Sequence, residues 1–323
     1  MVDKAIETLD IEKKPFLSRR AKAVLRIVFL LAVTAGLGFL FFQYRMPLGD
    51  WIEAAVDWLT TNLGGLFDFI STVIEWMTDK LEDLLLWPPA WVICGIFGLI
   101  GWKVRRISFG VFAFLGFLLI DSMLLWDDAM STLSLVLVAS IIAVAIGIPL
   151  GILAGKNELA STLFRPILDF MQTMPAFVYL IPAIIFFGIG KVPGVVSTVI
   201  FSMPPAVRLT ELGIRQVDKE VVEAAEAFGA PPFKVLRSIQ VPLAMPTIMA
   251  GVNQVIMLAL SMVVIAGIVG AGGLGAVVFR GVTRLDIGLG FEGGIAVVIL
   301  AIFLDRITAS LGQTRIEERA RTA

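Results

Sequence analysis

Histidine is absent from the 323-residue chain, and Cys94 is its only cysteine. The missing imidazoles remove the commonest metal ligand in proteins and the usual general base at neutral pH. A single cysteine excludes an intrachain disulfide. No H-E-x-x-H motif can exist, and no nucleophile–base pair is evident. We therefore expect no metal site, no catalytic residue and no enzymatic activity in this chain.

A complete nucleotide-binding loop is also missing. The nearest match to G-x-x-x-x-G-K-[ST] is 151–157, which is one residue short and ends in Asn157. The segment 270–275 matches G-x-G-x-x-G as a string, but it follows an apolar run and has no strand–helix unit around it. We expect no bound nucleotide and no other cofactor, so any energy from ATP must come through another subunit.

Charge is scarce in the chain: 16% of the residues are charged and 58% are hydrophobic. An average soluble domain is about 25% charged and about 45–50% apolar. The mean hydropathy of +0.92 lies in the same direction. The net charge of −1 is divided among separate loops without a basic face, which argues against nucleic acid as a partner. These values predict an all-α, polytopic integral membrane protein.

Eight apolar runs approach the length of about 20 residues that crosses a bilayer. They are 24–44, 84–102, 107–126, 131–155, 167–190, 193–210, 246–269 and 287–304. With a cytoplasmic N-terminus, all of the 26 Lys and Arg except Arg45, Lys80, Lys191, Arg280 and Arg284 fall on the cytoplasmic side or at adjoining helix ends. The positive-inside rule therefore predicts eight spans with both termini in the cytoplasm.

The spans divide the chain into four parts. Residues 1–23 are a polar cytoplasmic segment without a cleavage site, so we expect the first helix to be retained. Residues 24–130 hold the N-terminal spans, 131–310 form the main membrane domain, and 311–323 are a cytoplasmic tail. The external segment 47–83 carries eight acids and one base, with apolar residues at helical spacing. It predicts one or two amphipathic helices, which either seat the protein at the interface or form a docking or gating surface.

The long cytoplasmic loop 211–245 contains a predicted helix over 221–228. Gly229 is expected to end this helix, and Pro231 and Pro232 prevent its continuation. A second short helix over about 233–240 is expected to run to Pro242. The small residues Ala224, Ala225 and Gly229 allow close approach of a partner, and Glu223 and Glu226 offer carboxylates to basic groups. An ordinary loop helix is the alternative.

The spacing in this loop resembles that of the permease subunits of ATP-binding-cassette importers. Their pattern is E-A-A, three residues, G, nine residues, I-x-L-P. The chain has Glu223-Ala224-Ala225, Gly229, Ile239 and Pro242 in register, with Val241 in place of the leucine. The resemblance implies that Glu223, Ala224, Ala225, Gly229 and Pro242 belong to coupling helices that dock on an ATPase subunit.

From about Ser131 to Gln313 the chain is similar to the permeases of glycine betaine/proline uptake systems. The matching stretches include 172–179, 187–190, 193–196, 242–254, 258–266, 272–275, 284–286 and 304–306. The resemblance implies the type I importer permease fold, a homodimer in the bacterial inner membrane, two copies of a cytoplasmic ATPase subunit and a periplasmic substrate-binding protein. The first 130 residues carry little of it.

Polar and aromatic residues within the apolar spans are candidates for the substrate path. Gln172, Thr173, Asn253, Gln254 and Ser261 either face a water-filled path or bond between helices. Phe177 and Tyr179 either pass a quaternary ammonium over their rings or pack against helices and lipid. Gly270, Gly272, Gly273 and Gly275 are predicted to form an external gate, because glycine permits close approach and unusual dihedral angles.

Together with the apolar spans and the cytoplasmic loop, the resemblance implies an ABC importer permease for glycine betaine or proline betaine that works by alternating access. Choline and trimethylamine N-oxide are alternative substrates. A stand-alone channel or secondary carrier is an alternative of another class, although no charge relay at mid-membrane supports it. A membrane scaffold with 47–83 as its interaction surface is a further alternative.

Overall fold

The computed structural model describes residues 19–43 and 47–322 and divides into two compact units, Met1–Leu59 and Thr60–Ala323. Residues 1–18 of the predicted cytoplasmic segment 1–23 lie outside the described residues, as does Ala323 of the predicted tail. The described part of the chain consists of helices, turns and loops without a strand. This agrees with the predicted all-α class.

The first unit contains α1 (Arg19–Gln43) and the beginning of α2 (Leu48–Leu86). The apolar part of α1 is Arg26–Phe39, which lies within the predicted run 24–44. The 39-residue α2 confirms helix over most of 47–83, as one continuous helix.

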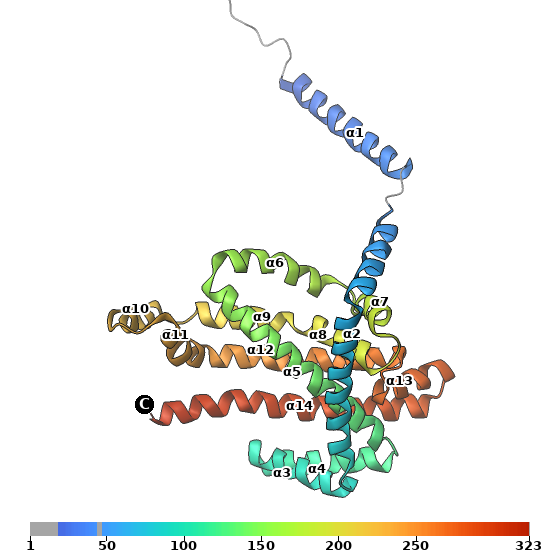
Figure 1. Ribbon diagram of the computed structural model, residues 1–323, viewed down its shortest axis with the longest axis vertical. Coiled ribbons are helices and arrows are strands. Elements are labelled where there is room, and N and C mark those ends of the chain that lie inside the picture. The colour runs from blue at the N-terminus through green and yellow to red at the C-terminus, as the bar shows by residue number, and fades with distance from the viewer. Residues whose placement is uncertain (1–18, 44–46, 323) are drawn as a thin grey trace, which may run out of the picture. The chain divides into compact units, whose positions relative to one another are not determined.

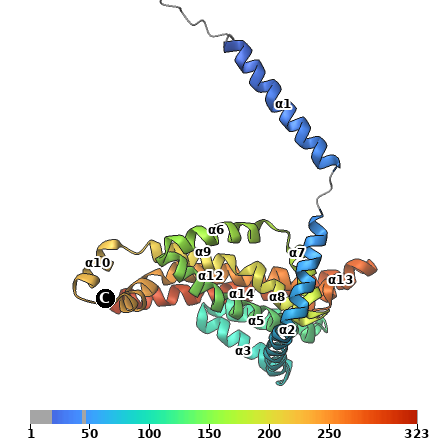
Figure 2. The same ribbon diagram turned by 45° about the horizontal axis from the view of Figure 1, so that its top comes forward.

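The second unit holds the rest of α2 and the remaining helices (Figure 1). These are α3 (Ala90–Val104), α4 (Ile107–Ser122), α5 (Trp126–Lys156), α6 (Glu158–Thr173), α7 (Ala176–Phe187), α8 (Lys191–Ser202), α9 (Pro204–Arg215), α10 (Lys219–Ala227), α11 (Pro232–Val235), the π-helix η1 (Leu236–Gln240), α12 (Val241–Ala266), the 3-10 helix η2 (Gly267–Val269), α13 (Gly273–Arg284) and α14 (Ile287–Thr322). Within this unit α12 packs against α5, α8, α9 and α14 (Figure 2).

Four helical stretches among the described residues are long and apolar enough to cross a membrane. They are Trp126–Lys156, Lys191–Arg215, Pro232–Val269 and Ile287–Ser310. Two bent helix pairs bring the number to six if each is one span. The predicted runs 24–44 and 107–126 fall on shorter apolar helices, Arg26–Phe39 and Ile107–Ser122. Length and composition thus support a multi-pass protein with four to six spans, and the eight-span topology stays a prediction.

The two bends occur where proline interrupts the chain. The helices Gly49–Leu86 and Ala90–Val104 meet at 98° across a break that contains Pro88 and Pro89. The predicted span 167–190 is broken in the structure, because α6 and α7 meet at 99° next to Pro175. The ring of proline excludes its nitrogen from the helical hydrogen-bond ladder and disfavours the α conformation of the preceding residue.

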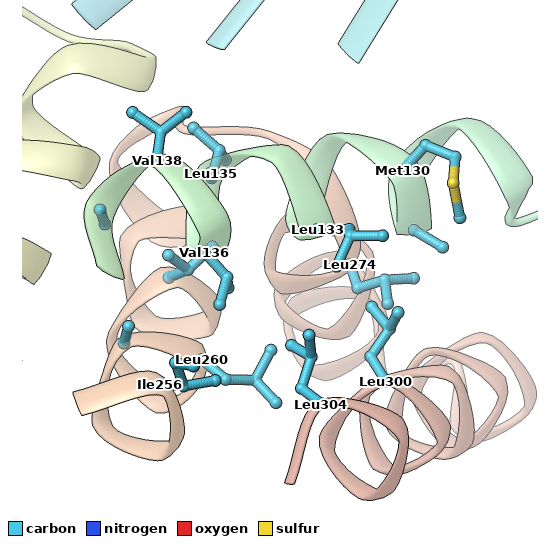
Figure 3. Close-up of a cluster of buried hydrophobic side chains, with 14 of the residues drawn as sticks. Met130, Leu133, Leu135, Val136, Val138, Ile256, Leu260, Leu274, Leu300 and Leu304 are labelled. Carbon is cyan, nitrogen blue, oxygen red and sulfur yellow. The ribbon is translucent and has the colours of Figure 1, made fainter. Parts of the chain in front are cut away.

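The core of the second unit is a single large apolar cluster. Figure 3 shows side chains of α5, α12, α13 and α14 that point toward one another within it. Val136 of α5, Leu274 of α13 and Leu300 of α14 are fully shielded from solvent. Ile93 and Phe117 of the preceding helices belong to the same cluster, so the N-terminal helices α3 and α4 are packed onto this core.

Small residues let α5, α9 and α12 approach one another closely. Gly147, Gly151 and Gly155 recur every four residues on one face of α5. A Cβ added to Gly151 would lie 2.5 Å from Thr210 Cβ and 2.6 Å from the Val207 carbonyl oxygen of α9. Gly251 of α12 meets α9 in a similar way. In a bilayer, helices associate through such van der Waals contact, because lipid removes most of the hydrophobic driving force. The near-match to a nucleotide loop at 151–157 is therefore a helix-packing sequence.

Candidate functional site

Helix α10 is a short helix with well-defined caps at both ends. The Asp218 carboxylate accepts a hydrogen bond from the Glu220 backbone nitrogen at 2.9 Å. At the other end the Gly229 nitrogen donates to the Glu226 carbonyl at 2.8 Å, and the Ala230 nitrogen donates to the Ala225 carbonyl at 3.1 Å. This is the Schellman arrangement, and it requires the positive φ of +77° at Gly229. The predicted end of the helix at Gly229 is confirmed.

The outer surface of α10 has no covering within the described chain. None of its nine residues, all of them described, is buried. Phe228 is 93% exposed and Phe233 is 70% exposed. Val222 packs against the small apolar cluster of Ile214 and Ala244, which ties α10 to the ends of α9 and α12. The helix is thus fixed at its base and open on its outer face.

The segment after α10 differs from the predicted short helix over 233–240. Here α11, η1 and α12 follow without a break, so the helix continues through Pro242 into the membrane domain. The π-turn Leu236–Gln240 lies just before Pro242, and the wider turn accommodates a residue that cannot donate a backbone hydrogen bond. Pro242 therefore marks a bulge in a continuous helix and not the end of one.

A groove of about 520 Å³ lies at the base of α10. Its lining includes Glu223 and Glu226 of α10, Arg215 and Ile214 of α9, and Gln240, with the remaining wall from Gly155, Val217, Lys219 and Val222. Lys156 Nζ at the end of α5 donates to Gln240 Oε1 at 3.0 Å. Two acids and several basic groups therefore meet in one open groove.

An ion-pair network connects α9 to α6 beside this groove. The Glu211 side chain is only 10% exposed, and its Oε1 accepts from Ser161 at 2.7 Å and pairs with Arg215 Nε at 3.1 Å and Arg165 at 3.5 Å. Arg215 also pairs with Glu158 at 2.7 Å and donates to the Ala154 carbonyl at 3.0 Å. A nearly buried carboxylate is stable only with such partners. Sequence reasoning missed this network, although Glu211 and Arg215 stand four residues apart on one helix face.

The structure places some predicted path residues between helices. Asn253 donates to Asp305 Oδ1 at 3.1 Å and accepts a hydrogen bond from Thr308, both on α14. Tyr179 is 8% exposed, and its hydroxyl donates to the Met171 carbonyl across the α6–α7 bend. Both side chains have a structural role here, which is one of the two alternatives that the sequence leaves open.

Other predicted path residues are exposed. Gln172, Thr173 and Phe177 are exposed at the α6–α7 bend. Gln254 and Ser261 belong to an exposed face of α12 that repeats every three or four residues. This α12 face comprises Leu243, Pro246, Ala250, Gln254, Met257 and Ser261. A period near 3.6 places them along one stripe of the helix, and in the second unit this stripe is open.

The predicted gate glycines lie in the closely packed turn between α12 and α13 and in the first turn of α13, at the end of the helices opposite α10. Gly270, Gly272 and Gly273 have φ values of +83°, +81° and +64°. A Cβ on Gly275 would lie 2.3 Å from the Val264 carbonyl oxygen. The Leu274 nitrogen donates to the buried Thr132 hydroxyl of α5 at 2.7 Å. Unusual dihedrals and close approach are present at this turn, and its gating role stays a prediction.

Charged groups that were predicted on one side of the membrane lie together in the structure. Lys156, Arg165 and Arg215, predicted as cytoplasmic, all lie near the base of α10. Lys191, predicted as external, pairs with Asp79 and Glu82 of the predicted external segment. The structure keeps the two groups of charges at separate helix ends, and the orientation of the ends stays a prediction.

A protein-family model described as binding-protein-dependent transport system inner membrane component matches residues 147–321. The glycine betaine/proline betaine transport system permease protein ProW of Escherichia coli strain K12 is 47% identical over 273 residues, which cover 84% of this chain and 77% of that protein. The glycine betaine transport system permease protein OpuAB of Bacillus subtilis strain 168 is 50% identical over 267 residues, covering 83% of this chain and 95% of that protein.

Solved structures agree on the fold. A structure of the MetNI methionine ABC transporter matches with a TM-score of 0.54 at 22% identity, covering 60% of this chain and 97% of the matched chain. At that identity the match supports the helix arrangement alone.

Proposed function

The chain belongs to the family of binding-protein-dependent transport system inner membrane components, and we propose that it is the permease subunit for glycine betaine and proline betaine. The membership makes it a transport subunit with the type I ABC importer fold, not an enzyme. The identity of 47% and 50% over 77% and 95% of the length of two relatives named for betaine transport carries the substrate class. In this proposal a binding protein selects the substrate and a separate subunit hydrolyses ATP.

The docking site for the ATPase subunit in this proposal is α10 with its flanking residues. The outer face of α10 is exposed and fixed at its base, as a coupling element requires. Glu223 and Glu226 offer negative charge, and Phe228 offers an apolar anchor that is 93% exposed. Exposed aromatic residues of this kind are frequent centres of binding energy in protein interfaces. Two copies of the permease would hold two ATPase subunits.

The substrate path in this proposal runs along the α12 face that is open in the second unit. A second copy of the chain would cover part of that face, which carries Gln254 and Ser261 among apolar residues. Phe177 is exposed at the α6–α7 bend and offers a ring to a quaternary ammonium. The turn with Gly270 and Gly275 would close the path toward a periplasmic binding protein, with both termini in the cytoplasm.

Alternating access follows from the connections within the second unit. The α11–η1–α12 helix joins the α10 region directly to the proposed path, and Lys156 and Arg215 tie the same region to α5 and α6. Closure of the ATPase pair would move α10, and these contacts would carry the motion to α12. In this proposal residues 131–310 form the permease core and residues 311–323 form a cytoplasmic tail.

Reconstitution into proteoliposomes with the cognate ATPase and binding protein tests this function. We expect ATP-dependent uptake of labelled glycine betaine, with unlabelled proline betaine as an effective competitor. Preferential uptake of choline or trimethylamine N-oxide would overturn the substrate class. Uptake at the same rate without any ATPase subunit would overturn the importer assignment in favour of a channel or secondary carrier.

A further inference from the structure

The second half of α2 holds the turn between α7 and α8 at two separate points. The Phe67 ring stacks on Phe186 with centroids 4.7 Å apart and meets the edge of Phe187 at 5.5 Å. Lys191 Nζ donates to Asp79 Oδ1 at 2.9 Å and Glu82 Oε2 at 2.7 Å. Phe67 and Asp79 are about 18 Å apart along the helix, given its rise per residue. Contacts at both points restrict rotation of the turn relative to α2.

The ion pairs of Lys191 are more shielded than a typical surface pair. The Lys191 side chain is 33% exposed and that of Glu82 is 19% exposed, while that of Asp79 is 57% exposed, so the shielded pair is the one with Glu82. The neighbouring pair of Lys80 and Asp83 on α2 is 64% and 71% exposed, with a separation of 3.4 Å. Exposed pairs contribute little, whereas partial removal from water strengthens the attraction. Lys80 therefore serves as a matched control for Lys191.

The same turn touches the glycine-rich turn after α12. A Cβ added to Gly270 would lie 2.9 Å from Ile189 Cγ2, so the Ile189 side chain lies against the Gly270 backbone. Ile189 is otherwise 80% exposed. Gly194 in the first turn of α8 lies against the same glycine-rich turn, since an added Cβ there would be 2.9 Å from Ala271 Cβ. The α7–α8 turn and the start of α8 are therefore held from two sides, by α2 through stacked rings and two ion pairs and by the glycine-rich turn through Ile189 and Gly194.

We propose that the second half of α2, residues 60–86, is a brace that moves as one body with the α7–α8 turn and holds Ile189 against Gly270. Lys191 is then a positioning residue for transport, because it fixes the turn without touching substrate. The inference rests on the proposed function in one respect: Gly270 belongs to the proposed external gate. Residues 60–86 lie outside residues 147–321, the part of the chain that the family model matches.

Substitution of Lys191 tests the positioning role. We expect Lys191→Gln to lower glycine betaine uptake about tenfold, as the loss of a partly buried charge partner predicts, with the ATPase subunit still co-purifying. Lys80→Gln should leave uptake unchanged. Reversing the pair with Lys191→Glu, Glu82→Lys and Asp79→Asn together should recover most of the uptake. Equal uptake by Lys191→Gln and wild type, or no recovery by the reversed pair, would overturn the proposal.

Distances between spin labels test the movement itself. Cys94 is the only cysteine, so a Cys94→Ala background allows labels at Leu84 of α2 and Ile185 of α7, which are 64% and 53% exposed. We expect the Leu84–Ile185 distance to be the same in the nucleotide-free and ATP-trapped complexes. A changed Leu84–Ile185 distance would contradict the brace.

ATP-dependent uptake by the wild-type complex separates the two proposals. If wild-type uptake fails, the proposed function is wrong whatever the labels show. If uptake proceeds while the Leu84–Ile185 distance follows the nucleotide state, only the brace is wrong.

Discussion

Gly229 and Gly275 lie at opposite ends of the membrane helices, and glycine is required at each for a different reason. Gly229 has a φ of +77° and no described atom within 4 Å of an added Cβ. Gly275 lies inside helix α13, where an added Cβ would be 2.3 Å from the Val264 carbonyl oxygen. Glycine is required at position 229 because of its positive φ, and at position 275 because a side chain would have no space.

Gly229 lies in an exposed surface suited to binding a partner, and Gly275 lies in a packed interior. Around Gly229, Phe228 and Glu223 are exposed, and α10 has no buried residue among its described positions. Around Gly275, Leu274 is fully shielded and hydrogen-bonded to Thr132 of α5. Substitutions near Gly275 should therefore affect folding, and those near Gly229 should mainly affect assembly with another subunit.

The largest effect is expected from Gly275→Ala. Even a single methyl group collides with backbone at this position, and overpacking of a close helix contact costs about 3 kcal/mol or more when neither backbone can move. Thermal unfolding of the purified variant in detergent measures the loss. An unchanged melting temperature of Gly275→Ala would contradict the close approach of α12 and α13.

Arg215→Gln should come next in size. It removes one of the three partners of the Glu211 carboxylate, which would keep Ser161 and the more distant Arg165, and it also breaks the ion pair with Glu158. A nearly buried carboxylate with incomplete pairing predicts a loss of about 2 kcal/mol. Lys80→Gln is the control, because Lys80 pairs with Asp83 where both side chains are exposed. Identical denaturant midpoints for the two variants would show that the network adds little.

Gly229→Ala should have a smaller effect. The left-handed conformation of a non-glycine residue costs about 1–2 kcal/mol, but the space beside Gly229 is open. Gly229→Asn should recover part of that cost, since asparagine adopts this conformation more readily. Hydrogen exchange of the α10 amides reports the local change. Faster exchange throughout α12 would mean that the cap supports more than α10.

Phe228→Ala should leave stability unchanged within about 0.5 kcal/mol, because exposed side chains contribute little to folding. The same variant should weaken binding of the ATPase subunit, since an exposed aromatic at a docking site is a typical anchor. Leu285→Ala, at an exposed residue near the other end, is the matched control. Equal ATPase affinity for both variants would exclude Phe228 from the interface.

The fold class could be predicted because composition and long apolar runs are read directly from the sequence and do not depend on tertiary contacts. The end of α10 at Gly229 followed from a residue type that favours one conformation. The continuity of α11, η1 and α12 could not be predicted from residue types, because a π-turn before Pro242 has no simple residue pattern. Pro175 disfavours a straight helix at the residue before it, but the 99° angle between α6 and α7 comes from packing between helices.

The candidate site was less accessible from sequence. Exposure of α10 followed from its polar residues, whereas the pairing of Asn253 with α14 depends on which face of α12 meets that helix. Tyr179 was equally ambiguous, because an aromatic in an apolar segment can face any neighbour. The packing of Gly147, Gly151 and Gly155 against α9 was visible as a four-residue repeat and could have been inferred.

Binding of the ATPase subunit to the permease in nanodiscs tests most directly the central claim that α10 is the docking site. The account predicts that Glu223→Lys combined with Gly229→Trp weakens this binding at least tenfold, while Glu292→Lys, an exposed acid near the other end of the helices, has no effect. Unchanged affinity of the double variant, with its fold intact by circular dichroism, would contradict the account.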